Sequence, residues 1–235
     1  MPELAKMTHP KMIRALIFDL DGLLADTELL HCQAYQKAFA EHGIVLDAQE
    51  YAEHWVRNGK GIIDWVDSRG LNFDPLTLRL RKSAHYLELL KSSLRPMDGA
   101  LDLLESLRGK FRIALASSSY PDAIDGVLAG LQIASHFEVI VSGLDVVAVK
   151  PAPDIFLLAA RALQVDPTEC LVLEDAEKGV VAAHRAGMRC IAVPNDFTRH
   201  HDFSLATRRC ASLREVNFDL LSAIEESNVA GILCH

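Results

Sequence analysis

Short, continuous apolar runs alternate with helix-forming stretches along most of this 235-residue chain. Five of these runs are predicted to be strands, at residues 15–18, 113–116, 139–141, 171–173 and 191–193. Runs that are apolar at every position are typical of parallel strands that are covered on both faces. Helices are expected before and between the last four runs, at about 98–108, 121–131, 153–164 and 177–186. The alternation predicts an α/β fold with a doubly wound, Rossmann-like parallel sheet.

A different pattern occupies the segment between the first and second predicted strands, because no strand-like run stands out there. Helices are expected over Glu28–His42 and Leu76–Leu90, and a third apolar stretch begins at Ile62. We therefore expect an all-helical cap domain inserted into the core. The expected limits are 12–27 with 95–225 for the core, 28–94 for the cap, and 1–11 with 226–235 for the termini.

Residues with reactive or charged side chains follow four of the predicted strands. In chain order they are Asp19 with Asp21, Ser117 with Ser118, Lys150, and Glu174 with Asp175. The carboxyl ends of parallel strands lie at one edge of the sheet, where open α/β sheets bind their ligands. We therefore expect four carboxylates, a hydroxyl and an ammonium group to meet in one crevice.

Such a group of side chains suits phosphoryl transfer. Carboxylates held close together repel one another unless a cation intervenes, and an oxygen-only ligand set favours Mg²⁺ over zinc. The ammonium of Lys150 and the hydroxyl of Ser117 match the oxygens of a phosphoryl group. One carboxylate can act as a covalent nucleophile, while its neighbour protonates the leaving oxygen and later deprotonates water.

Composition and charge exclude several other classes of function. The net charge is -8 and no basic stripe occurs, so nucleic acid is not expected as a partner. No apolar run approaches the ~20 residues of a membrane span, and residues 1–11 do not look like a signal peptide. The five cysteines are scattered and form no C-x-x-C pair, which fits reduced thiols in a cytoplasmic protein. The oligomeric state is not indicated, and a monomer is compatible with the sequence.

Four short motifs follow one another along the chain. They are Asp19-x-Asp21-Gly22-x-x-x-Asp26-Thr27, Ser117, Lys150-Pro151 and Glu174-Asp175. In order and spacing they resemble the motifs of the haloacid dehalogenase superfamily of phosphotransferases, over residues 12 to about 225. The helical insertion resembles the cap of that family's β-phosphoglucomutase-like phosphatase subgroup.

The resemblance implies catalytic roles for three of these residues. Asp19 would be the nucleophile and a ligand of Mg²⁺. Asp21 would be the general acid and base, and its backbone carbonyl would bind the same ion. Lys150 would screen the charge of Asp19, so that this anion can approach an anionic phosphate.

The resemblance also implies binding roles. Ser117, with Ser118 and Lys150, would hold the transferring phosphoryl group. Asp175 would bind Mg²⁺, and Glu174 would bind it as well or order its waters.

Residues of the predicted cap are harder to assign. Thr27 and His31 lie four apart and share a helix face, so they either face the active site or belong to a helix surface. Lys82, and Lys60 or Arg57, could meet a remote anion or hydroxyl of the substrate. For these three basic residues we favour the simpler interpretation, that they are exposed to solvent.

The sequence thus predicts a Mg²⁺-dependent phosphatase that hydrolyses a small phosphomonoester, with a sugar phosphate favoured, through an aspartyl-phosphate. The first alternative is a β-phosphoglucomutase-type phosphosugar mutase, which needs the same intermediate. The loop Ser118-Ser119-Tyr120-Pro121 lacks the basic and amide residues of the mutases, so the mutase ranks second. A non-catalytic binding protein on the same fold ranks third, because no catalytic group is missing. The substrate itself is not specified.

Overall fold

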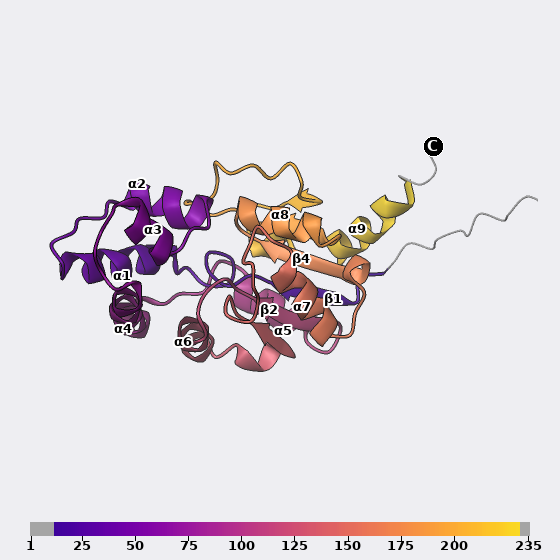
Figure 1. Ribbon diagram of the computed structural model, residues 1–235. Helices are drawn as coiled ribbons and strands as arrows, with labels where there is room; N and C mark the ends of the chain where they lie inside the picture. The colour runs from indigo at the N-terminus through magenta and orange to yellow at the C-terminus, as the bar shows by residue number, and fades with distance from the viewer. Residues whose placement is uncertain (1–11, 231–235) are drawn as a thin grey trace, which may run out of the picture.

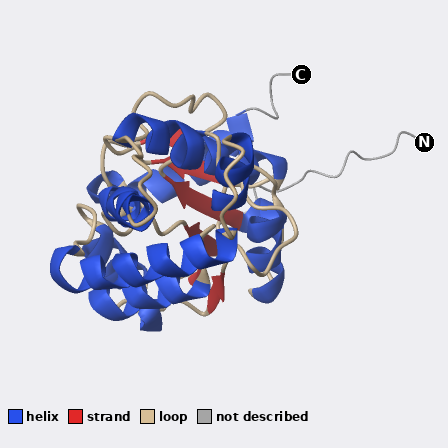
Figure 2. Ribbon diagram, turned by 60° about the vertical axis from the view of Figure 1, so that its left-hand side comes forward, coloured by secondary structure: helices blue, strands red, loops and turns tan. Residues whose placement is uncertain are grey.

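A six-stranded parallel sheet forms the centre of the computed structural model, which describes residues 12–230 and side chains up to residue 227. The strands are β1 (Ala15–Phe18), β2 (Arg112–Ala116), β3 (Val139–Val141), β4 (Cys170–Glu174), β5 (Arg189–Ala192) and β6 (Arg208–Arg209). Their order is β3-β2-β1-β4-β5-β6, and helices cover the sheet (Figure 2). The predicted doubly wound α/β fold is confirmed. The chain order reverses direction between β1 and β4, and ligand sites of such sheets lie outside the strand ends at this point.

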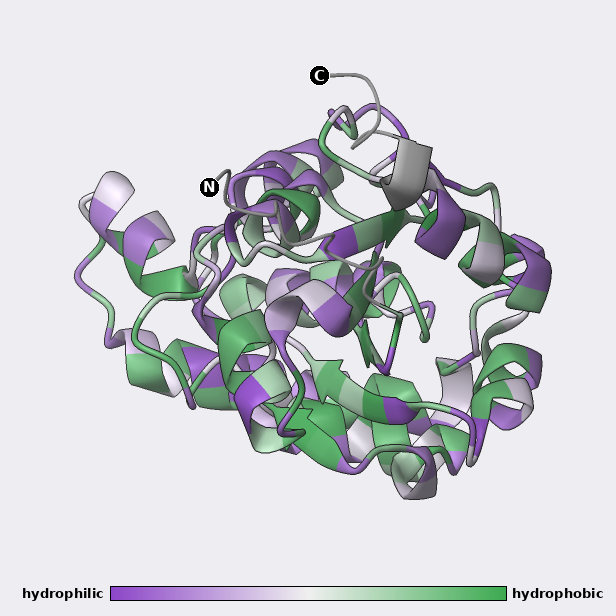
Figure 3. Cartoon of the chain, turned by 90° about the vertical axis from the view of Figure 1, so that its right-hand side faces the viewer, coloured by the Kyte–Doolittle hydropathy of each residue, from purple (hydrophilic) through white to green (hydrophobic). Residues whose placement is uncertain are grey.

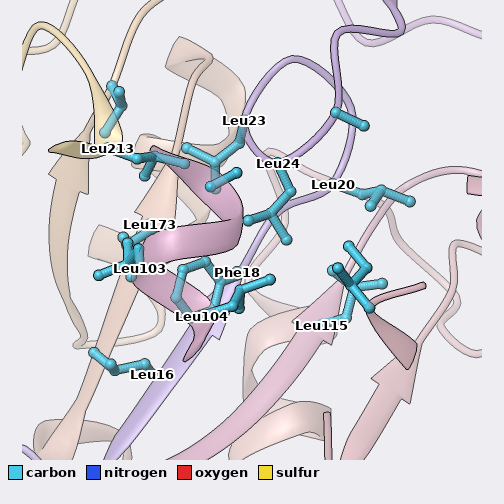
Figure 4. Close-up of a cluster of buried hydrophobic side chains, with 14 of the residues drawn as sticks. Leu16, Phe18, Leu20, Leu23, Leu24, Leu103, Leu104, Leu115, Leu173 and Leu213 are labelled. Carbon is cyan, nitrogen blue, oxygen red and sulfur yellow. The ribbon is translucent and has the colours of Figure 1, made fainter. Parts of the chain in front are cut away.

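Both faces of the central strands are buried, which explains their continuous apolar runs. On β1, Leu16 and Phe18 point into one hydrophobic cluster, whereas Ala15 and Ile17 point into another. The first cluster is closed by α5 (Ala100–Leu107), α6 (Pro121–Leu131) and α9 (Phe218–Ala230), and the second by α7 (Asp154–Ala162) and α8 (Glu177–Arg185). Figure 4 shows the leucine-rich first cluster, and Figure 3 shows hydrophobic residues along the central strands.

The segment between β1 and α5 is entirely helical in the structure. It contains α1 (Glu28–Ala40), α2 (Ala48–Tyr51), a π-helix η1 (Ala52–Arg57), α3 (Ile62–Ser68) and α4 (Pro75–Ser93). These helices lie together to one side of the sheet (Figure 1). A separate hydrophobic cluster holds them together, centred on the aromatic side chains of Phe39, Trp55 and Trp65.

The helical segment packs tightly onto the sheet-bearing part of the chain. Helix α4 lies against α6, where a Cβ atom on Gly126 would stand 2.9 Å from the side chains of Leu87 and Leu90. On the other side, Lys178 Nζ donates a hydrogen bond to the carbonyl oxygen of Trp55 at 3.0 Å. The two parts of the chain therefore contact each other in at least two places.

Several elements were not predicted from the sequence: α2, η1, α9, β6 and three short 3₁₀ helices, η2 (Ala134–His136), η3 (Pro167–Glu169) and η4 (Leu213–Glu215). Strand β6 consists of two exposed arginines at the sheet edge, where charge discourages pairing with another chain and leaves no apolar pattern. Among the described residues, no helix is long and apolar enough to cross a membrane.

Candidate active site

The carboxyl ends of β1, β2 and β4 place the first group of site residues. The strand ladder continues one residue past β1 and β2, since Asp19 N donates to Leu173 O at 3.1 Å and Ser117 N donates to Val141 O at 3.0 Å. The backbone of both residues is thereby fixed, while their side chains are free to face the crevice between β1 and β4. Asp19 is 7% exposed and Ser117 is 1% exposed.

Lys150 lies at the centre of the charge arrangement. It comes from the loop between β3 and α7 and is 2% exposed. Its Nζ donates to Asp19 Oδ1 at 2.5 Å, to Glu174 Oε1 at 2.6 Å and to Ala116 O at 2.8 Å. All three donors of the ammonium are therefore used. Burial opposes this charge, but the two carboxylates outweigh burial and raise the pKa of Lys150 above its ordinary value.

Glu174 is held from both sides of its carboxylate. Its Oε1 accepts from Lys150, and its Oε2 accepts from the backbone N–H of Asp175 at 3.0 Å and of Ala176 at 3.2 Å. The carboxylate packs against Gly179 of α8, where a Cβ atom would overlap the Glu174 side chain. Gly179 is thus required because no larger residue leaves room for Glu174 in this position.

Three buried carboxylates form a candidate cation site. Asp19, Glu174 and Asp175 each offer an oxygen, and these oxygens lie within 4.8 Å of one another. Burial, with the neighbouring carboxylates and against the effect of Lys150, raises the pKa of Asp19 to about 7. Burial and the charges of Glu174 and Asp19 also raise the pKa of Asp175 well above its ordinary value. One ammonium therefore does not balance the cluster, and its donor chemistry fits a further hard cation.

Asp21 lies in a separate network of hydrogen bonds. Its Oδ1 accepts from Thr27 Oγ1 at 2.7 Å and from His31 Nε2 at 2.9 Å. Its Oδ2 accepts from Ser119 Oγ at 2.6 Å and from Ser117 Oγ at 3.3 Å. Burial opposes ionisation, but His31 and the hydroxyl donors outweigh it and hold the pKa of Asp21 well below its usual value.

The protonation state of His31 follows from its two neighbours. A carboxylate can only accept, so Nε2 carries the proton toward Asp21, and Lys82 Nζ lies 2.7 Å from Nδ1, which must then accept. Burial, followed by the charge of Lys82, lowers the pKa of His31. The imidazole is therefore neutral, and its ring stacks on Tyr86 at 4.1 Å between centroids.

The predicted cap residues divide into two groups. Thr27 and His31 are buried beside Asp21, so the alternative of a helix-surface histidine is wrong. Lys82 is half-buried against His31, and the expectation of an exposed lysine is wrong here because α4 packs across the site rather than facing solvent. Arg57 and Lys60 are exposed, as expected, although Lys60 lines the rim of the cavity described below.

Asn195 and Ser119 were not assigned to the site from the sequence, and Gly179 was not recognised as the residue that leaves room for Glu174. Asn195 Nδ2 donates to Asp175 Oδ2 at 2.8 Å and to the carbonyl oxygen of Gly22 at 3.0 Å. Gly22 has φ +82°, and a Cβ there would stand 2.6 Å from Asp175 Oδ2. Asn195 comes shortly after the fifth predicted strand, so extending the strand-end argument by one strand would have found it. Gly179 could have been noticed as a glycine inside a helix.

The site residues border a cavity of about 390 Å³ between the helical segment and the sheet. One wall contains the groups from the strand ends, including Ser118, whose Oγ is buried without a hydrogen-bond partner. The opposite wall is aromatic and charged and comes from α1, α2, η1 and α4. Its members include Glu28, Tyr35, Tyr51, Trp55, Arg79, Lys82 and Tyr86. A small molecule in this cavity would contact both parts of the chain.

Proteins of similar sequence include some that are named as phosphatases. The chain is 37% identical over 216 residues to YhcW of Bacillus subtilis, with 89% of this chain and 96% of that protein covered. It is 33% identical over 183 residues to the fructose-1-phosphate phosphatase YqaB of Escherichia coli, with 76% and 95% covered.

Solved structures with the same fold include both phosphate-binding and mutase relatives. CbbY from Rhodobacter sphaeroides in complex with phosphate superposes with a TM-score of 0.83 at 30% identity, covering 90% of this chain and all of that one. A β-phosphoglucomutase from Clostridium difficile gives a TM-score of 0.80 at 26% identity, covering 93% of this chain and all of that one. The fold alone therefore does not separate hydrolysis from isomerisation.

The family model of the haloacid dehalogenase-like hydrolases matches residues 13–187, which carry all four strand-end motifs and the helical insertion. This match agrees with the sheet order and with the groups gathered at the strand ends. The chain therefore belongs to the haloacid dehalogenase-like hydrolase family and is an enzyme of its phosphatase class.

Proposed function

We propose that this enzyme is a Mg²⁺-dependent phosphatase that hydrolyses a small sugar phosphate through an aspartyl-phosphate on Asp19. The observation that carries the proposal is the position of Lys150, whose ammonium bridges Asp19 and Glu174 beside the buried Asp175. This arrangement keeps a nucleophilic carboxylate next to fixed positive charge in the lining of the cavity.

The donor set fits Mg²⁺. In our proposal, Asp19 and Asp175 hold the ion, because Asp19 Oδ1 and Asp175 Oδ2 have partners and each carboxylate keeps a second oxygen. Glu174 contributes mainly by positioning Lys150, since both of its oxygens already accept hydrogen bonds. When bound, Mg²⁺ supplies positive charge that offsets the repulsion between carboxylates and phosphate.

The chain's own residues then divide the reaction into two steps. Asp19 attacks phosphorus, and the bond from phosphorus to the ester oxygen breaks while Asp21 gives that oxygen a proton. Lys150 and the hydroxyls of Ser117 and Ser118 hold the phosphoryl oxygens during the transfer. Asp21 next takes a proton from water, which attacks the aspartyl-phosphate and regenerates Asp19.

The surroundings of Asp21 support this dual role. Its ionised form, held by Thr27, Ser119 and His31, is the form needed to deprotonate water. The first step needs the protonated form, which the negative charge of an arriving phosphate favours.

The helical segment supports a small substrate. We propose that residues 28–94 form a cap domain over the core of residues 12–27 and 95–225, and that the cap excludes bulk water from the cavity. The four described cysteines are buried free thiols, in keeping with the cytoplasm that we propose as the location.

A phosphosugar mutase is the second candidate. The contacts among Thr27, Asp21 and His31 are equally compatible with returning the phosphoryl group to a sugar hydroxyl. Measuring phosphate release beside isomerisation of glucose 1-phosphate would separate the two functions. Isomerisation without phosphate release would overturn the hydrolase.

The central test replaces Asp19 by Asn, which removes the nucleophilic charge at nearly constant volume. Phosphate release from sugar phosphates in the presence of Mg²⁺ should fall by at least about 10⁴-fold. Removing Mg²⁺ with EDTA should silence the unmodified enzyme, and added Mg²⁺ should restore it. Asp196→Asn, at a side chain that is 95% exposed, is the matched control. Near-normal turnover by Asp19→Asn would exclude the covalent mechanism.

A further inference from the structure

The loop after β5 contacts both parts of the chain. Asn195, near the start of this loop, donates a hydrogen bond to Asp175 Oδ2 at 2.8 Å. Two residues further on, Phe197 packs against the hydrophobic cluster of the helical segment that contains Trp55 and Trp65 (the cap cluster). In Figure 1 the loop extends past α8 toward the helical segment. Residues 195–197 therefore join the proposed metal site to the proposed cap.

A single amide group connects these two contacts. Asn195 Oδ1 accepts from the backbone N–H of Phe197 at 2.8 Å and from that of Thr198 at 3.2 Å. Its Nδ2 donates to Asp175 and to the carbonyl oxygen of Gly22, so the acceptor and both donors of the amide are used. The backbone of Phe197 thus fixes one side of the amide, and the other side holds Asp175. A displacement of Phe197 must move the group that orients Asp175.

The backbone of the loop is tied to the core on either side of this turn. Thr198 is fully buried, and its Oγ1 accepts from the backbone N–H of Asn195 at 3.0 Å. Further along the loop, the backbone N–H of Asp202 donates to Glu177 Oε2 at 3.1 Å, at the start of α8. Because the loop has little slack between these points, a displacement of Phe197 passes to Asn195 through a continuous set of hydrogen bonds.

A second contact joins the same two parts of the chain. Lys178 lies in the first turn of α8, three residues after Asp175, and its Nζ donates to the carbonyl oxygen of Trp55 at 3.0 Å. Trp55 lies in η1, and carbonyl groups near the C-terminal end of a helix lack partners within it and favour a cation. Helix α8 and the loop after β5 therefore both hold the cap cluster, and each does so from a position next to Asp175 or its partner Asn195.

We propose that Phe197 is a positioning residue that couples the docking of the cap on the core to the binding of Mg²⁺. While the cap cluster holds Phe197, the amide of Asn195 keeps Asp175 in place, and without this contact the carboxylate is less well oriented. Coupling between two sites is reciprocal, so a docked cap and a bound metal ion stabilise each other. The inference rests on the metal site of the proposed function and adds a means of regulating that site.

A purely structural role for Phe197 makes a different prediction. If Phe197 only covers the cap cluster, its truncation should lower stability and leave the affinity for Mg²⁺ unchanged. Phe73 is also partly buried against the cap cluster, but it belongs to the helical segment itself. Phe73→Ala is therefore the matched control, because it removes the same ring from the same cluster without altering the loop after β5.

Calorimetric titration with Mg²⁺ tests the coupling without requiring turnover. Phe197→Ala should raise the dissociation constant for Mg²⁺ at least about fivefold, less than the change of about tenfold expected for Asn195→Ala. Phe197→Tyr keeps the ring and should restore most of the affinity. Phe73→Ala should leave the affinity unchanged, and so should Asp196→Ala, at an exposed side chain of the same loop.

A double variant tests whether Phe197 acts through Asn195. Asn195→Ala with Phe197→Ala should bind Mg²⁺ no more weakly than Asn195→Ala alone, because the amide that transmits the effect is already absent. Losses that add would overturn this route. Circular dichroism checks the folding of each variant, and Phe197→Leu replaces Phe197→Ala if the latter does not fold.

Tryptophan emission tests the reciprocal effect of Mg²⁺ on the cap. The chain has two tryptophans, Trp55 and Trp65, and both belong to the cap cluster, so their emission reports on its surroundings. Saturating Mg²⁺ should change the emission of the unmodified protein and of Phe73→Ala, but not that of Phe197→Ala. An unmodified protein whose emission does not respond to bound Mg²⁺ would overturn the coupling.

The outcomes distinguish this inference from the proposed function. If the unmodified protein hydrolyses sugar phosphates but Phe197→Ala binds Mg²⁺ with unchanged affinity, the assignment of Phe197 is wrong and the proposed function stands. If no sugar phosphate is hydrolysed but Phe197→Ala weakens Mg²⁺ binding as expected, the proposed function fails and the coupling stands. Absence of Mg²⁺ binding by the unmodified protein would overturn the coupling.

Discussion

The two walls of the cavity differ in how their charged groups are paired. The core wall is formed by the groups at the strand ends, and the cap wall by the groups of the helical segment. On the core wall, Lys150 is matched by Asp19 and Glu174 at 2.5 and 2.6 Å. On the cap wall, among the described residues, Glu28 accepts a hydrogen bond from the neutral hydroxyl of Tyr51, and the Arg79 guanidinium lies 3.9 Å from Asp122 Oδ2. The charged groups of the core wall are thus paired within the protein, apart from the negative charge that a cation would balance. The charged groups of the cap wall are less tightly paired.

This difference separates the groups proposed to carry out the reaction from the groups proposed to select the substrate. Reacting groups must be held within a fraction of an ångström before substrate arrives, so their partners are built into the protein. Groups that recognise a substrate lose their purpose if the protein satisfies them first. We therefore expect the less tightly paired groups of the cap wall to be the ones that contact the substrate.

After the loss of activity expected from Asp19→Asn, the largest loss is expected from Gly179→Ala. This substitution tests whether the reaction tolerates a displacement of Glu174 and Lys150 on the core wall. The added Cβ would overlap Glu174, so Glu174 and with it Lys150 must move. We expect kcat to fall by about 100-fold with the fold retained, because small misplacements of positioning groups are costly. Initial rates of phosphate release measure this effect.

His184→Ala is the control for Gly179→Ala, since His184 is an exposed residue of the same helix. It should leave kcat unchanged. A normal kcat in Gly179→Ala would mean that the position of Glu174 does not matter for the reaction, and the contrast between a rigid core wall and an open cap wall would lose its basis.

An intermediate effect is expected from Asn195→Ala, which removes the amide that orients Asp175. Groups that orient metal ligands contribute about 10- to 100-fold to metal affinity. The Mg²⁺ concentration for half-maximal activity should therefore rise by about tenfold, while activity at saturating Mg²⁺ recovers most of its value. A loss of activity that Mg²⁺ does not restore would argue against a role through the metal.

The smallest effect concerns stability and the cap wall. Burial, opposed by Lys178, raises the pKa of Glu28 from 4.5 to about 7. The folded state thus holds this proton more tightly than the unfolded state, so Glu28 supports stability below about pH 4.5 and loses that support as the pH rises through about 7. Glu28→Gln should therefore gain about 1 kcal/mol of unfolding free energy relative to the unmodified protein between pH 5 and pH 8, a value reduced for partial exposure.

Urea unfolding without Mg²⁺ at the two pH values measures this gain. Glu53→Gln, which removes an exposed carboxylate of the same helical segment, is the matched control. The prediction is wrong if the difference in unfolding free energy between Glu28→Gln and the unmodified protein stays constant from pH 5 to pH 8. In that case folding does not raise the pKa of Glu28.

Local patterns in the sequence were enough to predict the sheet and the reacting groups. The five predicted strands contain short apolar runs because both sheet faces are buried there, and Asp19, Ser117 and Glu174 stand at or directly after the ends of such runs. Asp19 and Ser117 could therefore be placed from the chain alone, since parallel strands bring their carboxyl ends to one edge whatever the details of packing.

The cap wall could not be predicted in this way, because its groups lie on helix faces and the sequence does not say which face meets the core. Lys82 and Arg79 differ from the exposed Arg81 in the side of helix α4 on which they lie. Asn195 and Gly179 likewise gain their roles from side chains that are distant along the chain. The sequence by itself determined the fold and which polar groups follow the strand ends, because these depend on strand periodicity and order. Only the tertiary structure decided which cations lie in the cavity and which are already paired, because that depends on how two separate parts of the chain pack together.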